Sequence, residues 1–363
     1  MTRLTHTLDN RSFGKAPIGM IWPVLRLLGS PRLTLFILVA LGSGVIATYQ
    51  NVTGMTWAMV LPLILCALNL IAAIVTNGVF RWQLPLLIFH LCLLALILLV
   101  AAGRMTYLKG HLELTEGTWF EGELTASESG PWHNGRLDQV RFSNQGFRID
   151  YDPGMRRGPT RNMVNFLDTS RRTGQMVIGD QTPLVLYGYR FYTSYNKGFA
   201  PTFAWTPNGS VEGLVGSVHL PAYPLHEYRQ ARSWRLPGSE TEVWTMLQFD
   251  ENLIDATRPD EFKLPKNHVL VLRVDGQRRE LQPGQGVELA GGRLMYLGLR
   301  AWMGYTVFYD WTLPWLLAAA LAAACALGWH FWQKFSRQPW NAKAGEEPVV
   351  ETDDMEGFIN GHA

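Results

Sequence analysis

The sequence predicts a membrane protein. Four transmembrane α-helices, three N-terminal and one C-terminal, carry a large extracytoplasmic all-β domain, folded as a sandwich or an open barrel. The first observation is four apolar stretches that reach or approach the roughly 20 residues needed to cross about 30 Å of hydrocarbon. They lie at residues 33–49, 57–80, 84–102 and 313–332. The second is the long segment between the third and fourth stretches, where short runs of β-branched and aromatic residues alternate with Gly, Pro and Asn.

The distribution of charge orients the predicted helices. The 32 basic and 30 acidic residues nearly balance, so the chain lacks the basic excess that a nucleic-acid partner requires. Basic residues gather before the first stretch, between the second and third, and after the fourth: Arg3, Arg11, Lys15, Arg26, Arg32, Arg81, Lys334, Arg337 and Lys343. The connection between the first two stretches, 50–56, has neither Lys nor Arg. The positive-inside rule therefore predicts that both termini are cytoplasmic.

These observations divide the chain into five parts. They are a cytoplasmic segment at 1–32, three helices within 33–103, an extracytoplasmic β-domain at 104–310, a fourth helix at 311–333 and a cytoplasmic tail at 334–363. The tail is acidic and rich in turn-forming residues, which predicts disorder. The first apolar stretch is followed by further spans and has no A-x-A-like cleavage site, so we expect a membrane anchor instead of a removable signal peptide.

Two hairpins and one strand start are expected in the β-domain. The stretch "QVRFSNQGFRIDYD" (139–152) alternates apolar and polar residues around a predicted turn at Asn144–Gly146. The stretch "HVLVLRVDGQRREL" (268–281) does the same around Asp275–Gly276. Pro183 is expected to start a strand or to mark a sheet edge, because proline lacks the amide hydrogen that a central strand donates.

The motifs of common enzyme classes are missing from the sequence. Cys66, Cys92 and Cys325 each fall in a different apolar stretch and are expected to be packing residues. No C-x-x-C occurs, which excludes a thioredoxin-like redox centre, and no C-x-x-C-H occurs, which excludes a c-type cytochrome. There is no G-x-S-x-G elbow, P-loop or dinucleotide fingerprint, and no catalytic group can be identified.

His90 interrupts the apolar run "LPLLIFHLCLLALILLV" (84–100). Polar residues inside membrane spans are uncommon and usually face a partner, a cavity or a cofactor. The residue lies about six positions past the cytoplasmic entry of its helix, roughly 9 Å along the axis. Two interpretations stay open. The imidazole is either hydrogen-bonded to a backbone carbonyl or a neighbouring helix, or it serves as a haem ligand or proton relay.

His330 is the second candidate haem ligand. It lies near the inner end of the fourth predicted helix, on the cytoplasmic side like His90, so one haem held by both histidines is geometrically allowed. Its position between Trp329 and Trp332 favours an interfacial anchoring role instead. The remaining histidines of the β-domain show no tight metal-ligand spacing: His111, His133, His219, His226 and His268. No metal other than haem iron is expected.

Three stretches of the sequence carry a family signature. In "LLGSPRLTLFILVALGSGVIATYQ" (27–50), a Ser-containing segment with a basic residue leads into an apolar helix that ends near Ala47–Thr48. In "FHLCLLALILLVAAGRMTYLKGHLELTEG" (89–117), a histidine-bearing span is followed by a Gly-rich exit and an acidic–Gly pair. In "VIGDQTPLVLYGYRFYTSYNKG" (177–198), a Pro–Leu precedes an aromatic-rich "FYxSxY". With the three-plus-one order of spans, these stretches resemble the ResB (also called CcsB) family of System II cytochrome c biogenesis.

The resemblance implies a role in haem transport. ResB-type proteins pair with a ResC/CcsA-type multispan protein, move haem outward and present it for attachment to the C-x-x-C-H cysteines of apocytochrome c. The resemblance implies that His90 is an axial ligand to haem b and that the partner supplies the second ligand. It implies this role for no other residue of the chain. It also implies a multi-pass protein of the bacterial inner membrane, with residues 104–310 in the periplasm. Within a cytochrome c synthetase (haem lyase) complex, the implied role is that of a non-catalytic subunit.

Two other classes of function stay open. One is the b-type haem membrane subunit of a quinol redox complex, in which His90 and His330 hold one haem. The other is an assembly or sensor protein that presents the β-domain, in which His90 only packs. The first predicts haem in the isolated chain, and the second predicts no haem in any preparation.

Overall fold

The computed structural model describes residues 18–50 and 56–336, and the chain divides into two compact units. The helical unit comprises 1–101 and 314–363, and the β unit comprises 102–313. The predicted disordered tail beyond residue 336 and the first three basic residues of the chain lie outside the described residues.

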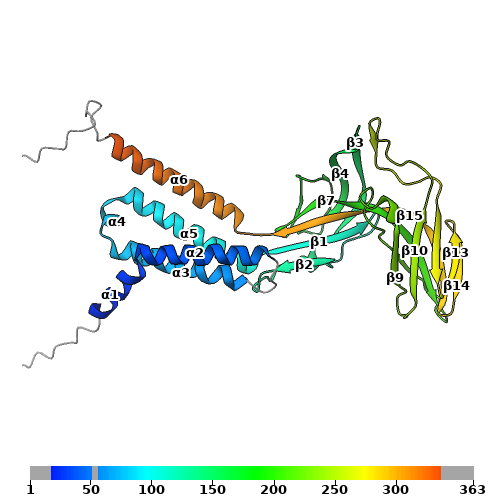
Figure 1. The fold of residues 1–363 in the computed structure, drawn as a ribbon, viewed down its shortest axis with the longest axis horizontal. Coiled ribbons are helices and arrows are strands. Elements are labelled where there is room, and N and C mark those ends of the chain that lie inside the picture. The colour runs from blue at the N-terminus through cyan, green and yellow to red at the C-terminus, as the bar shows by residue number, and fades with distance from the viewer. Residues whose placement is uncertain (1–17, 51–55, 337–363) are drawn as a thin grey trace, which may run out of the picture. The chain divides into compact units, whose positions relative to one another are not determined.

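Among the described residues, four helices are long and apolar enough to cross a membrane, as predicted: α2, α3, α5 and α6 (Figure 1). The helices are α1 (Ile18–Leu28), α2 (Pro31–Tyr49), α3 (Thr56–Thr76), α4 (Val79–Trp82), α5 (Leu84–Thr106) and α6 (Leu313–Ser336). The sequence did not anticipate the separate short helices α1 and α4. The helix formed by the second apolar stretch, α3, ends at Thr76 and not at the expected residue 80. Asn77 and Gly78 interrupt the helical backbone before α4. The third extends past the expected residue 102 to Thr106.

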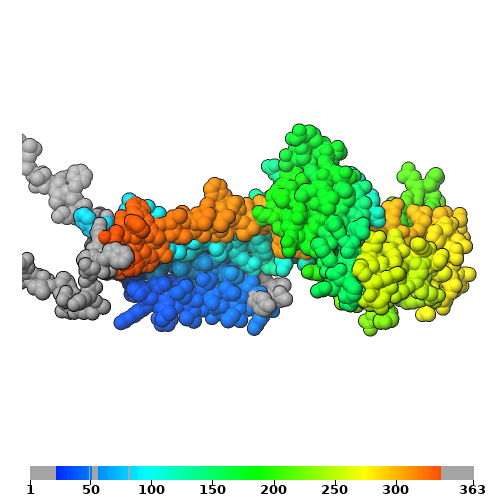
Figure 2. Space-filling model, turned by 90° about the horizontal axis from the view of Figure 1, so that it is seen from above, coloured from blue at the N-terminus to red at the C-terminus, as the bar shows by residue number. Residues whose placement is uncertain are grey.

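Small residues let α2 and α3 pack closely, and Figure 2 shows their side chains as one continuous blue surface. A Cβ atom placed on Gly44 would lie 2.2 Å from the carbonyl oxygen of Ala58. A Cβ atom on Gly29 would lie 2.9 Å from the amide nitrogen of Ala73. Close approach of backbones over Gly and Ala is how helices associate where lipid supplies no hydrophobic driving force between them.

The β unit consists of three antiparallel sheets, and its described residues form no closed barrel (Figure 1). The predicted fold class is therefore confirmed. The strands are β1 (Leu108–Thr115), β2 (Ala126–Ser129), β3 (Phe142–Asp152), β4 (Arg156–Leu167), β5 (Thr173–Ile178), β6 (Leu184–Leu186), β7 (Tyr189–Pro207), β8 (Leu214–Ser217), β9 (Ala231–Arg235), β10 (Glu242–Gln248), β11 (Asp260–Glu261), β12 (Val269–Val274), β13 (Gln277–Leu281), β14 (Gly286–Leu289) and β15 (Gly292–Tyr309).

Two long strands, β7 and β15, pair along almost their whole length and organise the largest sheet. Its order is β2-β1-β15-β7-β6, with β14 on β15 and β8 on β7. The other sheets have the orders β13-β12-β10-β9 and β11-β3-β4-β5. Apolar side chains from all three sheets form one core, in which Phe142, Phe191 and Tyr305 are fully buried. The first strand pairs with the last, Leu108 opposite Tyr309, so both ends of the β unit meet in one sheet.

One of the two predicted hairpin turns is present. Asp275 and Gly276, with φ angles of 50° and 76°, connect β12 to β13, as expected for a tight turn that needs left-handed residues. Pro183 immediately precedes β6, as expected for a strand start. The predicted turn at Asn144–Gly146 is wrong, because β3 continues through it and pairs with β4 on both sides of a bulge. The Asn144 side chain accepts a hydrogen bond from Gly146 N, which satisfies that amide locally without reversing the chain.

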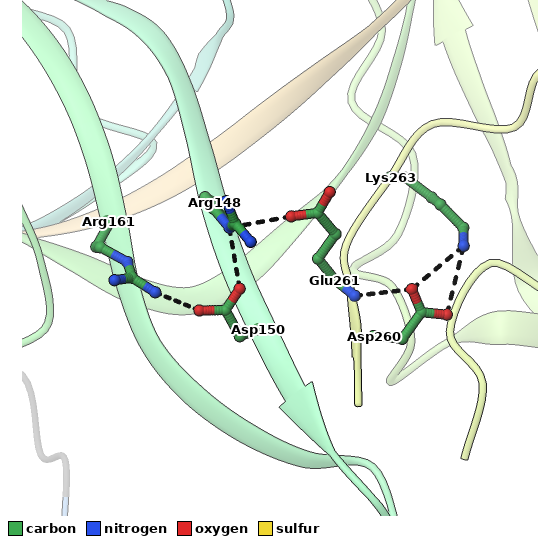
Figure 3. A network of polar contacts seen from close by, with 6 residues as sticks. All are labelled: Arg148, Asp150, Arg161, Asp260, Glu261 and Lys263. Carbon is green, nitrogen blue, oxygen red and sulfur yellow. Dashed lines mark hydrogen bonds and ion pairs between the residues drawn. The ribbon is translucent and has the colours of Figure 1, made fainter. Parts of the chain in front are cut away.

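Surface ion pairs accompany the pairing of the short strand β11 with β3 (Figure 3). Arg148 lies between Asp150 and Glu261, with Nε 3.0 Å from a carboxylate oxygen of each. Arg161 also pairs with Asp150. These side chains are largely exposed, so their ion pairs add little to stability. We infer that they mainly help to align β11 with β3.

Candidate functional site

A cavity of about 480 Å³ lies within the helical unit and includes His90 in its wall. Its lining comes from α2, α3, α4, α5 and the turns beside them: Gly29, Pro31, Thr34, Leu35, Leu38, Asn69, Leu70, Ala73, Thr76, Asn77, Phe80 and His90. The N-terminal ends of α2 and α5 contribute together with the C-terminal half of α3. Under the predicted orientation, this places the cavity toward the cytoplasmic side of the membrane.

The ring of His90 is held by a hydrogen bond to its own helix. Its Nδ1 lies 2.7 Å from the carbonyl oxygen of Leu86, one turn earlier in α5. Because a carbonyl oxygen only accepts, Nδ1 carries the proton and donates, which in the neutral imidazole leaves the lone pair on Nε2. The rings of Phe80 and Phe89 meet the imidazole edge to face, with centroids 4.6 and 5.3 Å away. The side chain therefore has a set tautomer and aromatic neighbours.

This geometry suits a metal ligand. Imidazoles that bind metals commonly donate the second ring N–H to a carbonyl or carboxylate, which orients the ring and raises the basicity of the ligating nitrogen. Within the described part of the chain, Nε2 of His90 makes no hydrogen bond. The bond to Leu86 would equally satisfy a histidine that only packs, so both interpretations of His90 stay open.

Asn69 and Thr34 form a polar pair in the same wall. Oγ1 of Thr34 donates to Oδ1 of Asn69 over 2.8 Å, and Nδ2 of Asn69 donates to the carbonyl oxygens of Leu28 and Ser30. Asn69 is only 4% exposed and ties the turn between α1 and α2 to α3. Asn69 was not among the residues predicted from the sequence, although a lone asparagine in an apolar stretch was a usable signal.

His330 does not contribute to this cavity. It lies in α6 and packs edge to face against its neighbour Phe331, with ring centroids 5.7 Å apart. Among the residues that line the cavity, His90 is the only histidine.

Three histidines of the β unit, His133, His219 and His268, hydrogen-bond neighbouring protein groups through their rings. His133 bridges the carbonyl of Thr106 and the hydroxyl of Tyr189, at 2.8 and 2.9 Å. His219 bridges Glu113 and Thr115, at 3.0 and 2.8 Å. Over residues 18–50 and 56–336, no group of three or more His, Cys, Asp or Glu side chains could hold a metal ion.

Comparisons with known proteins give a distant structural likeness. No family model matches the sequence, and no curated protein matches it. Among solved structures, the chain is similar to a protein described as "Cytochrome c Heme Lyase CcmF", with 13% sequence identity and a TM-score of 0.27. The match covers 86% of this chain and 38% of that chain. At this TM-score the likeness carries no argument about fold or function.

Proposed function

We propose that this chain is a ResB-like subunit of a membrane complex for cytochrome c maturation, in which it helps to deliver haem across the membrane for attachment to apocytochrome c. In this proposal His90 is an axial ligand to haem b during transit, and a ResC/CcsA-type partner supplies the second ligand. The subunit itself is non-catalytic. Its setting is the bacterial inner membrane, with both termini in the cytoplasm and the β unit in the periplasm.

One observation carries the proposal: an imidazole with an unused Nε2 lines a cavity among membrane-spanning helices. Haem needs a nitrogen ligand for its iron and apolar contacts for its macrocycle. The cavity offers one such nitrogen, with Phe80, Leu35, Leu38 and Leu70 nearby. Its lining contains a single imidazole, which fits a haem whose second ligand comes from another protein.

The similarity of 27–50, 89–117 and 177–198 to ResB-type stretches supports the same function. In this proposal the β unit holds the apocytochrome near the point of haem exit and thereby raises its effective concentration. Because the β unit begins and ends in one sheet next to its connections to α5 and α6, it is tethered to the membrane at both ends.

The test is the haem content of the full chain purified with a co-expressed ResC-type partner. We expect His90→Ala to lose the b-type absorption bands and the haem stain while the complex still co-purifies. Added imidazole should restore part of the spectrum in His90→Gly, because it can occupy the space of the missing ring. His330→Ala, the matched control on another spanning helix, should retain haem.

Unchanged haem in His90→Ala, with the complex intact, would rule out the ligand role. Loss of haem in both variants, with haem present in the isolated wild-type chain, would favour the quinol redox subunit. Normal maturation of all c-type cytochromes in cells lacking the protein would overturn the proposed function as a whole.

A further inference from the structure

A buried lysine lies within the β unit. Lys197, on β7, is 2% exposed, and its Nζ lies 5.5 Å from the ring centroid of Tyr151 on β3. Arg157 and Asp180 lie beside them. We call Tyr151, Arg157, Asp180 and Lys197 the Lys197 cluster. Burying a lysine is costly unless its charge is paired, so the charges of the four residues are compared below.

A bulge in β7 gives the cluster its shape. Lys197 pairs with Met303 and Thr193 with Tyr305, so three residues of β7 lie opposite the single residue Gly304 of β15. Bulges of this kind re-aim side chains. Tyr195, inside the bulge, is 75% exposed, and the guanidinium carbon of Arg157 lies 4.4 Å from its ring centroid. The outer edge of the cluster is therefore close to solvent.

The one carboxylate of the cluster is already committed. Asp180 accepts two hydrogen bonds from Arg157, at 2.9 and 3.2 Å, one from the hydroxyl of Thr193 at 2.8 Å and one from the amide of Thr160 at 3.3 Å. Burial by itself would raise the pKa of Asp180. The hydrogen bonds from Arg157, and then those from Thr193 and Thr160, outweigh burial, so the pKa of Asp180 lies below its ordinary value. The Arg157–Asp180 pair is thus neutral overall, and the positive charge of Lys197 remains.

Two further polar atoms of the cluster are buried without a hydrogen-bond partner. They are the hydroxyl of Tyr151 and Nε of Arg157. Both can donate, and Lys197 can donate three hydrogen bonds. In the described part of the chain, Nζ of Lys197 makes no ion pair or hydrogen bond. These unused donors, beside a lysine that makes no ion pair, are contacts that an anionic acceptor could satisfy.

We propose that the Lys197 cluster is a binding site for a single oxyanion group, either a carboxylate or a phosphate, held by Nζ of Lys197 and the hydroxyl of Tyr151 and reached past Tyr195. The site lies wholly within the β unit and does not depend on the proposed haem function. Asp180 and Lys197 of the cluster lie in the single stretch 177–198. The neighbouring residues Thr193 and Tyr195 lie in the same stretch.

The pKa of Lys197 supports a positive charge that Asp180 does not balance. Burial, and then the nearby Arg157, lower the pKa of Lys197 from 10.5 to about 8, while Asp180 opposes the shift. A folded-state pKa below the unfolded value means that the unfolded chain binds more protons between pH 8 and 10.5. The buried charge therefore lowers the free energy of unfolding by its full amount below about pH 8. This destabilisation decreases as the pH rises toward 10.5. A bound anion would reduce that cost at pH 7, where Lys197 is charged.

The test is the thermal unfolding of the full chain in detergent at pH 7, titrated with sodium phosphate or sodium acetate at constant ionic strength. We expect a saturable rise in the Tm of the wild type, because a ligand that binds only the folded state stabilises it. Lys197→Met should abolish the rise, and Lys266→Met, which changes an exposed lysine, should retain it. A response to phosphate alone or to acetate alone identifies which of the two anions the site accepts.

Tyr151→Phe keeps the aromatic ring and removes the hydroxyl, so we expect about tenfold weaker anion binding. This variant keeps the test decisive if Lys197→Met fails to fold. At pH 10, where Lys197 is neutral, the acetate effect should vanish. Equal Tm shifts in the wild type and Lys197→Met, or no saturable shift in the wild type, would overturn the proposal.

Discussion

Asn162 lies at the centre of a fully buried polar network in the β unit. Its Nδ2 donates to Oδ1 of Asn144 over 2.7 Å and to the carbonyl of Gly146 over 2.8 Å. Its Oδ1 accepts from the hydroxyl of Tyr305 over 2.7 Å. The network joins β15 to the bulge of β3, where Asn144 in turn donates to the carbonyl of Leu114. Such networks stabilise when every member is satisfied and are costly when one member is removed.

We predict that Asn162→Ala destabilises the chain by about 3 kcal/mol, because it leaves the buried hydroxyl of Tyr305 without its acceptor and removes the donor to Asn144 Oδ1 and the carbonyl of Gly146. Thermal unfolding of the full chain, followed by near-ultraviolet circular dichroism, measures the effect. Asn165→Ala is the matched control on the same strand, since within the described residues Oδ1 of Asn165 accepts only from the exposed side chain of Gln175. Equal effects of the two substitutions would contradict the prediction.

At the scale of elements, the contact of α2 with α3 depends on one missing side chain. Gly42 and Gly44 lie two residues apart in α2, and their surroundings differ. A Cβ atom on Gly44 would collide with the backbone of Ala58, whereas a Cβ atom on Gly42 meets nothing within 4 Å. The same substitution at the two positions therefore separates helix packing from helix propensity.

We predict that Gly44→Ala weakens the packing of α2 on α3 and costs about 1–3 kcal/mol, the usual range for an added methyl group in a well-packed interface. Gly42→Ala should be neutral or slightly stabilising, because alanine is the better helix former. Unfolding in dodecyl sulfate, followed by helical circular dichroism, gives the comparison. Equal stability of the two variants would show that the helices separate easily at Gly44.

At the scale of the whole molecule, the four spanning helices set the membrane orientation. The basic residues before α2, at the connection from α3 to α5 and after α6 predict that both termini face the cytoplasm. The β unit then lies on the opposite side, because α5 leads into it and α6 follows it.

We predict that a cysteine placed in the β unit is labelled from outside the cell. With Cys66, Cys92 and Cys325 changed to alanine, Met155→Cys, in the turn between β3 and β4, should react with a membrane-impermeant maleimide in intact spheroplasts. Lys343→Cys should react only after the membrane is permeabilised. Labelling of Lys343→Cys in intact spheroplasts would contradict the orientation.

The sequence by itself determined the four spanning helices, the all-β class of the segment between them and the Asp275–Gly276 hairpin. Apolar length, β-branched content and left-handed turn residues are local properties, so one stretch of chain suffices to identify each. His90 stood out for the same reason, as a polar residue in an apolar run. The local pattern also led to the wrong prediction of a turn at Asn144–Gly146. The bond from Gly146 N to the Asn144 side chain is compatible with a turn and with a bulge, so the local sequence does not separate the two.

Only the tertiary structure decided which residues meet. The cavity beside His90 joins parts of four helices, and Asn69 enters it through bonds to residues about 40 positions away in the chain. The Lys197 cluster unites β3, β4 and β7 with the segment after β5, and no spacing in the sequence relates Tyr151 to Lys197. The physical reason is that burial and pairing of charge depend on the long-range register of strands and helices, which packing of the whole core selects.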